Sequence, residues 1–189
     1  PQSNGRGLDL AALPAAGVEL PHSAQLDMQG GSWTVEMYAR LDGDENGQLL
    51  THQLSTGWQV GIQLVNAKPE LSVDSVDGTR HTVASDAAIN DNAWHYLAAV
   101  WNAADQILSL YVDGLLFQKS GEDFGEEPLE VVQGWGPFAI GAGMDNGWID
   151  ELRVWRTAKT VQELAENHYT MVTANNTELA AYYRFDDNG

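Results

Sequence analysis

The stretch WHYLAAVWNAADQILSLYVDG, from Trp94 to Gly114, decides the fold. Its first half alternates with a period of two, and apolar or aromatic side chains occur on both resulting faces. Ile107–Val112 continues this alternation. A strand that is apolar on both faces lies inside a sheet, with another layer packed against each face. The stretch therefore predicts two neighbouring strands in the middle of a sheet.

Two turns set the direction of these strands. Asn102–Gln106 is too long for a two-residue turn and is typical of a loose hairpin loop. Asp113 and Gly114 can adopt the positive φ angles of a tight type I′ turn. We therefore expect Leu115–Lys119 to return antiparallel to the strand before it.

The rest of the chain repeats this pattern of short strands and turns. About a dozen strands, with turn signals roughly every ten residues, indicate an all-β protein built as a two-sheet sandwich or a barrel. Ser32–Arg40 has one apolar and one amphipathic face, as sandwich strands do. One helix is predicted at Thr160–His168, because Thr160 and Glu163 form a capping box. Leu179–Asp186 then reads as the closing strand.

Composition bounds the class of protein. The chain has 189 residues, 43% of them hydrophobic, which suffices for one packed domain. No apolar run approaches the roughly 18 residues of a membrane span, and 0 cysteines exclude disulfide scaffolds and thiolate metal sites. The chain begins with neither methionine nor a signal peptide. We therefore expect residues 1–6 to be a linker or frayed end, and residues 7–189 to be one domain of a larger protein.

The charge excludes two classes of partner. There are 27 acidic and 9 basic residues, for a formal net charge of −18. Phosphate-rich partners would be repelled, so we expect neither nucleic-acid binding nor insertion into an anionic membrane. The carboxylates fit either a solvated surface in a salty or extracellular setting, or, for a few of them, Ca²⁺ ligation.

Residues 42–47, DGDENG, are the strongest metal-site candidate. Asp42, Asp44 and Asn46 alternate before Gly47, which resembles the start of an EF-hand loop, where alternate oxygens converge on a hard cation. The position of the closing bidentate glutamate holds Gln53 instead. A polar hairpin loop with two turn dipeptides is the alternative interpretation.

Several segments, in this order, resemble laminin G-like jelly-roll domains of the concanavalin A-like superfamily. They are SWTVEMY, WHYLAAVW, LSLYVDG, GWIDELRVWRTAKTVQEL and LAAYYRFDD, and they lie between Gly7 and Asp187. The resemblance implies an all-β, two-sheet antiparallel jelly-roll sandwich with one short helix before the last strand. The fold alone does not define function, because it hosts lectins, adhesins, hydrolases and spacers.

The resemblance also implies Ca²⁺ at the rim or where the terminal strands meet. The Asp-Gly pair that the family often has after its first strand corresponds here to Ala11 and Ala12, which weakens a metal site at that position. The acid of the closing strand remains as Asp186. Asp9 is expected near it, because the two ends of such domains pair.

An enzyme is disfavoured. Glycosidases need two carboxylates about 5 Å apart, and relatives with this activity carry them at alternating positions of one strand. The nearest segment, Trp148–Arg153, lacks that pair, and the positions of Glu151 and Arg153 indicate a surface ion pair or cross-strand partners. The five histidines are scattered, and there is neither a G-x-S-x-G motif nor a glycine-rich phosphate loop.

Surplus tryptophans favour a binding module. The patterns assign core positions to Trp33, Trp94, Trp101 and Trp155, whereas Trp58, Trp135 and Trp148 lie at strand ends or in loops. Indole rings stack on sugar rings, and Asp145 and Asn146 beside Trp148 can bond sugar hydroxyls. Packing of the three tryptophans at the rim is the alternative.

The sequence thus predicts a non-catalytic, Ca²⁺-stabilised module that binds a glycan or cell-surface polysaccharide. We expect it to belong to an extracellular bacterial adhesin or a multidomain glycan-active protein, next to other domains of that chain. A spacer or protein-binding domain of a cell-surface protein is the second hypothesis. A glycoside hydrolase is the third.

Overall fold

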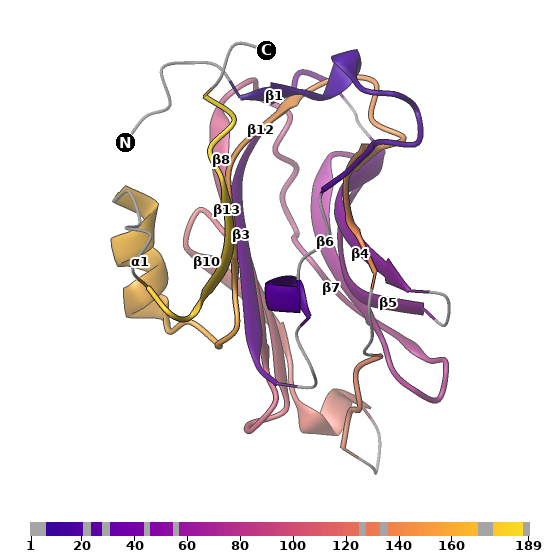
Figure 1. Ribbon diagram of the computed structural model, residues 1–189, viewed down its shortest axis with the longest axis vertical. Helices are drawn as coiled ribbons and strands as arrows, with labels where there is room; N and C mark the ends of the chain where they lie inside the picture. The colour runs from indigo at the N-terminus through magenta and orange to yellow at the C-terminus, as the bar shows by residue number, and fades with distance from the viewer. Residues whose placement is uncertain are drawn as a thin grey trace.

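The computed structural model of the protein describes residues 7–20, 24–27, 31–43, 46–54, 57–124, 128–132, 136–169 and 176–186, apart from the side chains of Gln53, Leu54, Trp58, Gln59, Glu122 and Tyr169. Within these residues, two antiparallel sheets pack face to face and one helix covers the outer face of the first sheet (Figure 1). The fold is the predicted all-β jelly-roll sandwich, with its short helix before the last strand.

The described part of the first sheet has seven strands in the order β1-β12-β3-β8-β9-β10, with β13 also beside β12. The strands are β1 (Leu8–Asp9), β3 (Trp33–Arg40), β8 (Trp94–Asn102), β9 (Ile107–Val112), β10 (Leu115–Lys119), β12 (Trp148–Trp155) and β13 (Leu179–Tyr183). All their pairings are antiparallel.

The second sheet has six strands among the described residues, in the order β2-β11-β4-β5-β6-β7. They are β2 (Val18–Glu19), β4 (Gly47–Leu54), β5 (Gly57–Val65), β6 (Lys68–Asp74), β7 (Arg80–Ala84) and β11 (Phe138–Ala142). Three short 3₁₀ helices join strands: η1 (Leu10–Ala12), η2 (Ala24–Leu26) and η3 (Gly121–Phe124).

The stretch from Trp94 to Gly114 has the predicted structure. β8 lies in the middle of its sheet, between β3 and β9. Asp113 and Gly114 have φ angles of 50° and 84°, and Val112 pairs with Leu115, so the turn and the antiparallel return are confirmed. Positive φ at both central residues is what a type I′ turn requires.

Both faces of β8 are covered, as its sequence predicts. Leu97, Ala99 and Trp101 belong to the core between the sheets. Tyr96 and its outward-facing neighbours form a second cluster with Leu164, which comes from α1 (Val161–Tyr169). The helix is therefore the layer that shields the outer face of the first sheet.

The start of α1 follows the predicted capping box. The Thr160 backbone N–H donates to Glu163 Oε2 at 2.8 Å, and the Glu163 N–H donates to Thr160 Oγ1 at 3.2 Å. These bonds satisfy backbone groups that have no partner within the helix. No helix in the described residues is long and apolar enough to cross a membrane.

The closing strand is shorter than predicted, because β13 ends at Tyr183 rather than Asp186. It pairs with residues 152–155 of β12, and β1 pairs with residues 148 and 149 along the same edge. That edge is therefore shared by the first and the last strand, which leaves little of it for a longer β13.

Candidate functional site

Two loops that carry predicted ligand residues meet at one end of the sandwich. Loop 41–47 follows β3, and loop 143–147 precedes β12, the antiparallel neighbour of β3. The Asn146 side-chain amide donates to the backbone oxygen of Asp42 at 2.6 Å. We call the described residues of these two loops the loop rim. The structure thus brings together two segments that the sequence analysis selected for different reasons.

Backbone hydrogen bonds from neighbouring segments hold the loop rim in place. They run from Asn66 N to Asn46 Oδ1 at 2.9 Å, from Asn92 N to Leu41 O at 2.8 Å and from Leu10 N to Gly147 O at 2.9 Å. Asn46 therefore already uses one lone pair of its side-chain oxygen, and a second remains for another contact. Asp145 lies exposed on the same rim.

Trp148 takes part in a stack at the end of β3. The Arg40 guanidinium carbon lies 4.2 Å from the Trp148 ring centroid and 5.5 Å from that of Trp94. Cations favour the face of an indole electrostatically. Arg40 covers one face of Trp148, so a stacking ligand would have to use the other face or the ring edge. Trp94, predicted for the core, is half-buried in this stack.

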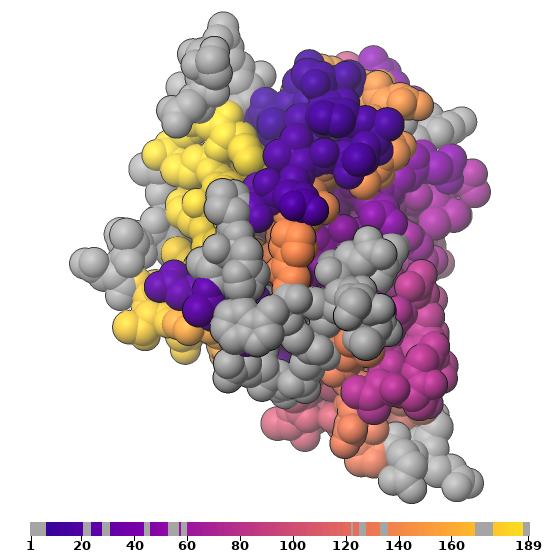
Figure 2. All heavy atoms as spheres, turned by 45° about the vertical axis from the view of Figure 1, so that its right-hand side comes forward, coloured from indigo at the N-terminus to yellow at the C-terminus, as the bar shows by residue number. Residues whose placement is uncertain are grey.

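The two predicted ligand acids of the terminal strands have separate partners. The Asp9 carboxylate accepts a hydrogen bond from Ala11 N at 3.0 Å and so caps η1, whereas Asp186 pairs with Arg184. In the described residues the terminal strands pair with β12 rather than with each other. The N-terminal (indigo) and C-terminal (yellow) residues lie side by side at this end of the sandwich (Figure 2).

Three predicted site residues are not placed by the structure. Asp44 and Trp135 lie outside the described residues, and Trp58 lies in β5 without a described side chain. Among the described residues, no three His, Cys, Asp or Glu side chains gather as ligands of a metal ion. Between the described predicted site residues, the side-chain hydrogen bond that the structure records is the one from Asn146 to Asp42.

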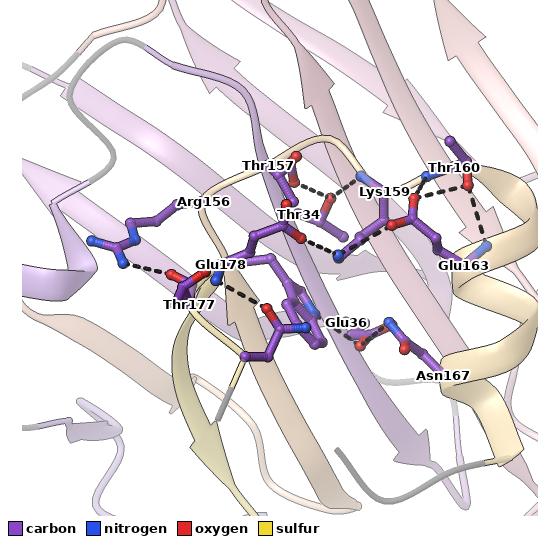
Figure 3. A network of polar contacts seen from close by, with 12 residues as sticks. Thr34, Glu36, Arg156, Thr157, Lys159, Thr160, Glu163, Asn167, Thr177 and Glu178 are labelled. Atoms are coloured by element: carbon purple, nitrogen blue, oxygen red, sulfur yellow. Dashed lines mark hydrogen bonds and ion pairs between the residues drawn. The ribbon is translucent and has the colours of Figure 1, made fainter. Parts of the chain in front are cut away.

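The sequence analysis missed a buried network of charged groups beneath α1. Glu36 is 0% exposed and accepts hydrogen bonds from the Tyr96 hydroxyl, from Trp155 Nε1 at 2.9 Å and from Asn167 Nδ2 at 3.1 Å. Arg153 Nη1 lies 3.5 Å from Glu36 Oε1. We call these groups, with Glu151 and Tyr182, the Glu36 network. Figure 3 shows Asn167 of α1 reaching Glu36 on the sheet.

Glu151 and Arg153 form the expected ion pair, but its predicted surface position is wrong. Arg153 Nη2 donates to Glu151 Oε2 at 2.8 Å, and the residues are 1% and 6% exposed. The register of β12 against β3 shifts between Asp150 and Arg153, and Glu151 has a φ of 52°. This β-bulge breaks the strict alternation on which the surface prediction rested.

Burial and pairing move the pKa values of this network in opposite directions. Burial raises the pKa of Glu36, while the Tyr96 hydrogen bond and the charge of Arg153 oppose that rise. Burial also lowers the pKa of Arg153, but Glu36 and Glu151 outweigh it and raise the pKa overall. Glu36, Glu151 and Arg153 have almost no contact with solvent, whereas Asn167 and Tyr182 are half-buried. Their role is to hold α1 against the sheet.

Lys159 connects α1 to the segment just before β13. Its ammonium lies 2.7 Å from Glu178 Oε2 and 3.3 Å from Glu163 Oε1 (Figure 3). It also lies 4.5 Å from the Trp155 ring centroid.

The sequence contained one signal of this buried outer face. Because β8 is apolar on both sides, its outer side must be covered, and residues on the neighbouring strands must then lie beneath the same layer.

His95 lies between two carboxylates at the start of β8. Its Nδ1 is 2.6 Å from Asp113 Oδ2 and its Nε2 is 2.8 Å from Asp91 Oδ1. Burial lowers its pKa, but the hydrogen bonds that its ring donates to both aspartates outweigh burial and raise the pKa above 6.5. Two acceptors favour the imidazolium, in which both ring nitrogens are donors.

We expect the stability gained from His95 to be complete below pH 6.5 and to be lost as the pH rises through its raised pKa. Replacing His95 with glutamine should therefore destabilise the protein more at about pH 5.5 than at about pH 8.5. Urea unfolding of both proteins at the two pH values measures the difference. An equal loss of stability at both pH values would show that the charge of His95 does not contribute to folding.

Comparison with known proteins identifies a family with which this chain shares its sequence pattern. The sequence matches, over residues 14–165, the family model described as the concanavalin A-like lectin/glucanases superfamily. No curated protein matches the sequence.

Similar solved structures include three toxin binding domains. The binding domain of Paraclostridial Mosquitocidal Protein 1 has a TM-score of 0.61 at 15% identity, covering 80% of this chain and 39% of that chain. The receptor binding domain of botulinum neurotoxin D has a TM-score of 0.63 at 14% identity, covering 80% and 40%. The botulinum neurotoxin serotype G binding domain has a TM-score of 0.61 at 9% identity, covering 76% and 37%. Such identities show a shared fold alone, over about two fifths of the length of those chains.

Proposed function

Because the chain belongs to the concanavalin A-like lectin/glucanases superfamily, we propose that it is a non-catalytic binding module that recognises carbohydrate at its loop rim, with Ca²⁺ stabilising the rim loops. The single observation that carries this proposal is the contact between loops 41–47 and 143–147 beside the Trp148–Arg40 stack. It places an aromatic ring, a cation and several oxygen acceptors at one end of the sandwich.

The chemistry of the rim suits a sugar. The half-buried Trp148 ring would contact the C–H face of a sugar ring with its edge or with the face that Arg40 leaves uncovered, and Arg40 can donate to ring or hydroxyl oxygens. Asp145 and Asn146 lie in the adjacent loop and can accept or donate bonds with hydroxyls. The structural neighbours named as binding domains support a binding role at the level of the module.

Ca²⁺ would use oxygen ligands of the same rim. Ca²⁺ takes six to eight oxygens, and Asp42, Asn46 and Asp145 provide such atoms in the described residues. Asp44, from the same predicted motif, and the strand-end acids Asp9 and Asp186 belong to this proposal as further ligands. A bound ion would order the loops and neutralise part of the net charge of −18.

The setting that we propose is extracellular, within a larger bacterial adhesin or multidomain glycan-active protein. A glycan or cell-surface polysaccharide is the partner, and other domains of the same chain are its neighbours. Neither nucleic acid nor membrane fits the charge. A module of this kind would have no catalytic carboxylate pair.

The proposal predicts that Trp148→Ala lowers affinity for the best glycan from an array screen by about tenfold or more, because truncating an aromatic anchor at a binding surface costs about 2 kcal/mol. Isothermal titration calorimetry in Ca²⁺ measures the change. Leu116→Ala, at an exposed position of edge strand β10, is the matched control and should bind as the unaltered protein does. If the folded Trp148→Ala protein bound the glycan as tightly as the unaltered protein, the proposal that glycan binds at the loop rim would be wrong.

The metal part is tested by thermal unfolding in EDTA and in excess Ca²⁺. Ca²⁺ at a concentration a hundred times its Kd would stabilise the folded protein by about 2.7 kcal/mol. Asp42→Ala combined with Asp44→Ala should remove the shift, and Asp86→Ala, an exposed acid elsewhere, should keep it. No shift in the unaltered protein would refute Ca²⁺ binding. No glycan bound in either condition would favour the spacer or protein-binding hypothesis.

A further inference from the structure

The end of the sandwich opposite the loop rim contains a pocket. Its volume is about 640 Å³, within the range of pockets that hold small ligands. Trp33 and Trp101, paired across β3 and β8, form part of its wall. Trp33 begins the strand that ends at Arg40, so about 23 Å of strand separates the pocket from the Trp148 stack. The pocket is therefore a separate site. Figure 1 shows η3 at this end, far from β1.

The opposite wall is the segment 128–132, which is held firmly in place. Val76 N donates to Glu130 O at 2.8 Å, and Val132 N donates to Asp74 O at 2.7 Å. Leu129 and Val131 point apolar side chains into the same core cluster as the two tryptophans. The pocket is therefore formed without a ligand, which limits the entropy lost on binding.

Among the described lining residues, the one side-chain amide is that of Gln106, and hydrogen bonds within the protein already occupy it. Gln106 Nε2 donates to Ala103 O at 3.0 Å, and Gln106 Oε1 accepts from Leu129 N at 2.6 Å. Apart from the indole N–H groups, the remaining polar side chain among the described lining residues is Glu130, which is exposed, and none of these residues is basic. An anionic ligand would find no opposite charge here.

An adjoining pocket of about 330 Å³ shares Glu130 and adds a second carboxylate, Asp77. Its hydrogen bond from Ser75 lowers the pKa of Asp77, so this group stays ionised. Burial lowers the pKa of His81, the histidine in that lining, so it is neutral near pH 7. The described lining residues of the two pockets include two carboxylates and neither lysine nor arginine. Lys119, whose charge also lowers the pKa of His81, lies outside this lining, and Arg80 is paired with Asp74. The lining itself therefore favours positive charge, and the net charge of −18 reinforces this.

We propose that the larger pocket binds a small organic cation, an amine or quaternary ammonium that carries an aromatic or branched apolar body. The body lies against Val76 and Pro128, the exposed apolar side chains of the described lining, above the buried wall that includes Trp101, and the charged end lies beside Glu130. Burial of the body supplies the affinity, and the carboxylate supplies the selection for positive charge.

Three probes with the same ring separate these contributions: phenethylamine, 2-phenylethanol and phenylacetate. Titration at neutral pH, followed by NMR shifts of the tryptophan indole signals, gives the affinity of each. We expect the amine to bind about fivefold tighter than the alcohol, as one exposed ion pair allows, and the anion to bind weakest. Equal affinities, or no binding by any probe, would overturn the proposal.

Two substitutions and a control test whether the probes bind in this pocket. Glu130→Gln should reduce the affinity for the amine to that for the alcohol and leave the alcohol unchanged. Val76→Phe should weaken both probes by narrowing the mouth, since Val76 is 63% exposed and lines the pocket. Val65→Phe, the same change at an exposed position at the other end of the second sheet, is the control. An unchanged affinity in a folded Val76→Phe protein would refute this location.

Discussion

Replacing Arg153 with methionine is expected to lower the free energy of unfolding by about 3–5 kcal/mol, because it leaves the buried Glu36 carboxylate without its counter-charge and Glu151 with Arg184 alone, 3.9 Å away. Glu36 is 0% exposed and Glu151 is 6% exposed, so water cannot replace the guanidinium. Chemical denaturation near pH 7 measures the loss. Arg156→Met is the matched control, because Arg156 is exposed and its loss should cost less than about 1 kcal/mol.

The pH dependence of the Arg153 variant gives an independent check. Without Arg153 the pKa of Glu36, already raised by burial, should rise further, and the folded protein should then bind a proton more tightly than the unfolded chain. Stability falls with rising pH wherever the folded state binds more protons. The loss should therefore be smaller at about pH 4 than at about pH 7. A loss below 1 kcal/mol at both values would show that the network contributes little.

Gly147→Ala is expected to destabilise the protein by about 3 kcal/mol, the combined cost of backbone strain and of a forced contact. Gly147 has a φ of 108°, and a Cβ there would lie 2.7 Å from Leu41 Cδ2 and 3.0 Å from the backbone oxygen of Arg40. Since Gly147 joins loop 143–147 to β12, the loop rim should be disturbed as well. Thermal and urea unfolding measure the loss.

Gly143→Ala separates the two causes. Gly143 has a φ of 71°, but a Cβ there would meet nothing within 4 Å. Its replacement should cost about 1 kcal/mol, which is the strain alone. If Gly143→Ala were as costly as Gly147→Ala, the close packing against β3 would not be the reason for glycine at position 147.

The helix illustrates what a local pattern can and cannot reveal. Thr160 and Glu163 are three residues apart, so the sequence predicted their capping bonds directly. The residue that α1 presents to Glu36 is Asn167, which is 131 residues away along the chain. No local periodicity carries that information, and for this reason the Glu36 network was missed.

In the candidate site, too, some features were predicted from the sequence and others depend on the tertiary structure. The sequence selected Asp42 and Asn146 as polar loop residues, and the structure shows that they are in contact although 104 residues separate them. Trp148 was predicted as a stacking platform, but the Arg40 guanidinium on one of its faces depends on the register between β3 and β12. The prediction of Trp94 as a core residue was wrong for the same reason, since it lies at the end of β8 beside that cation.

By itself, the sequence determined the elements whose causes are local: the alternation of β8 and β9, the turn at Asp113 and Gly114, and the helix cap. These patterns left a sandwich and a barrel open, and the family resemblance favoured the two-sheet sandwich. Hydrophobic periodicity and turn chemistry act over a few residues, so they can be read directly. Tertiary structure alone decided which polar groups are buried, where the bulge at Glu151 falls and which loops meet at the rim. These outcomes depend on the pairing of strands far apart in sequence, and burial of a charge is favourable only when those strands bring its partners to it.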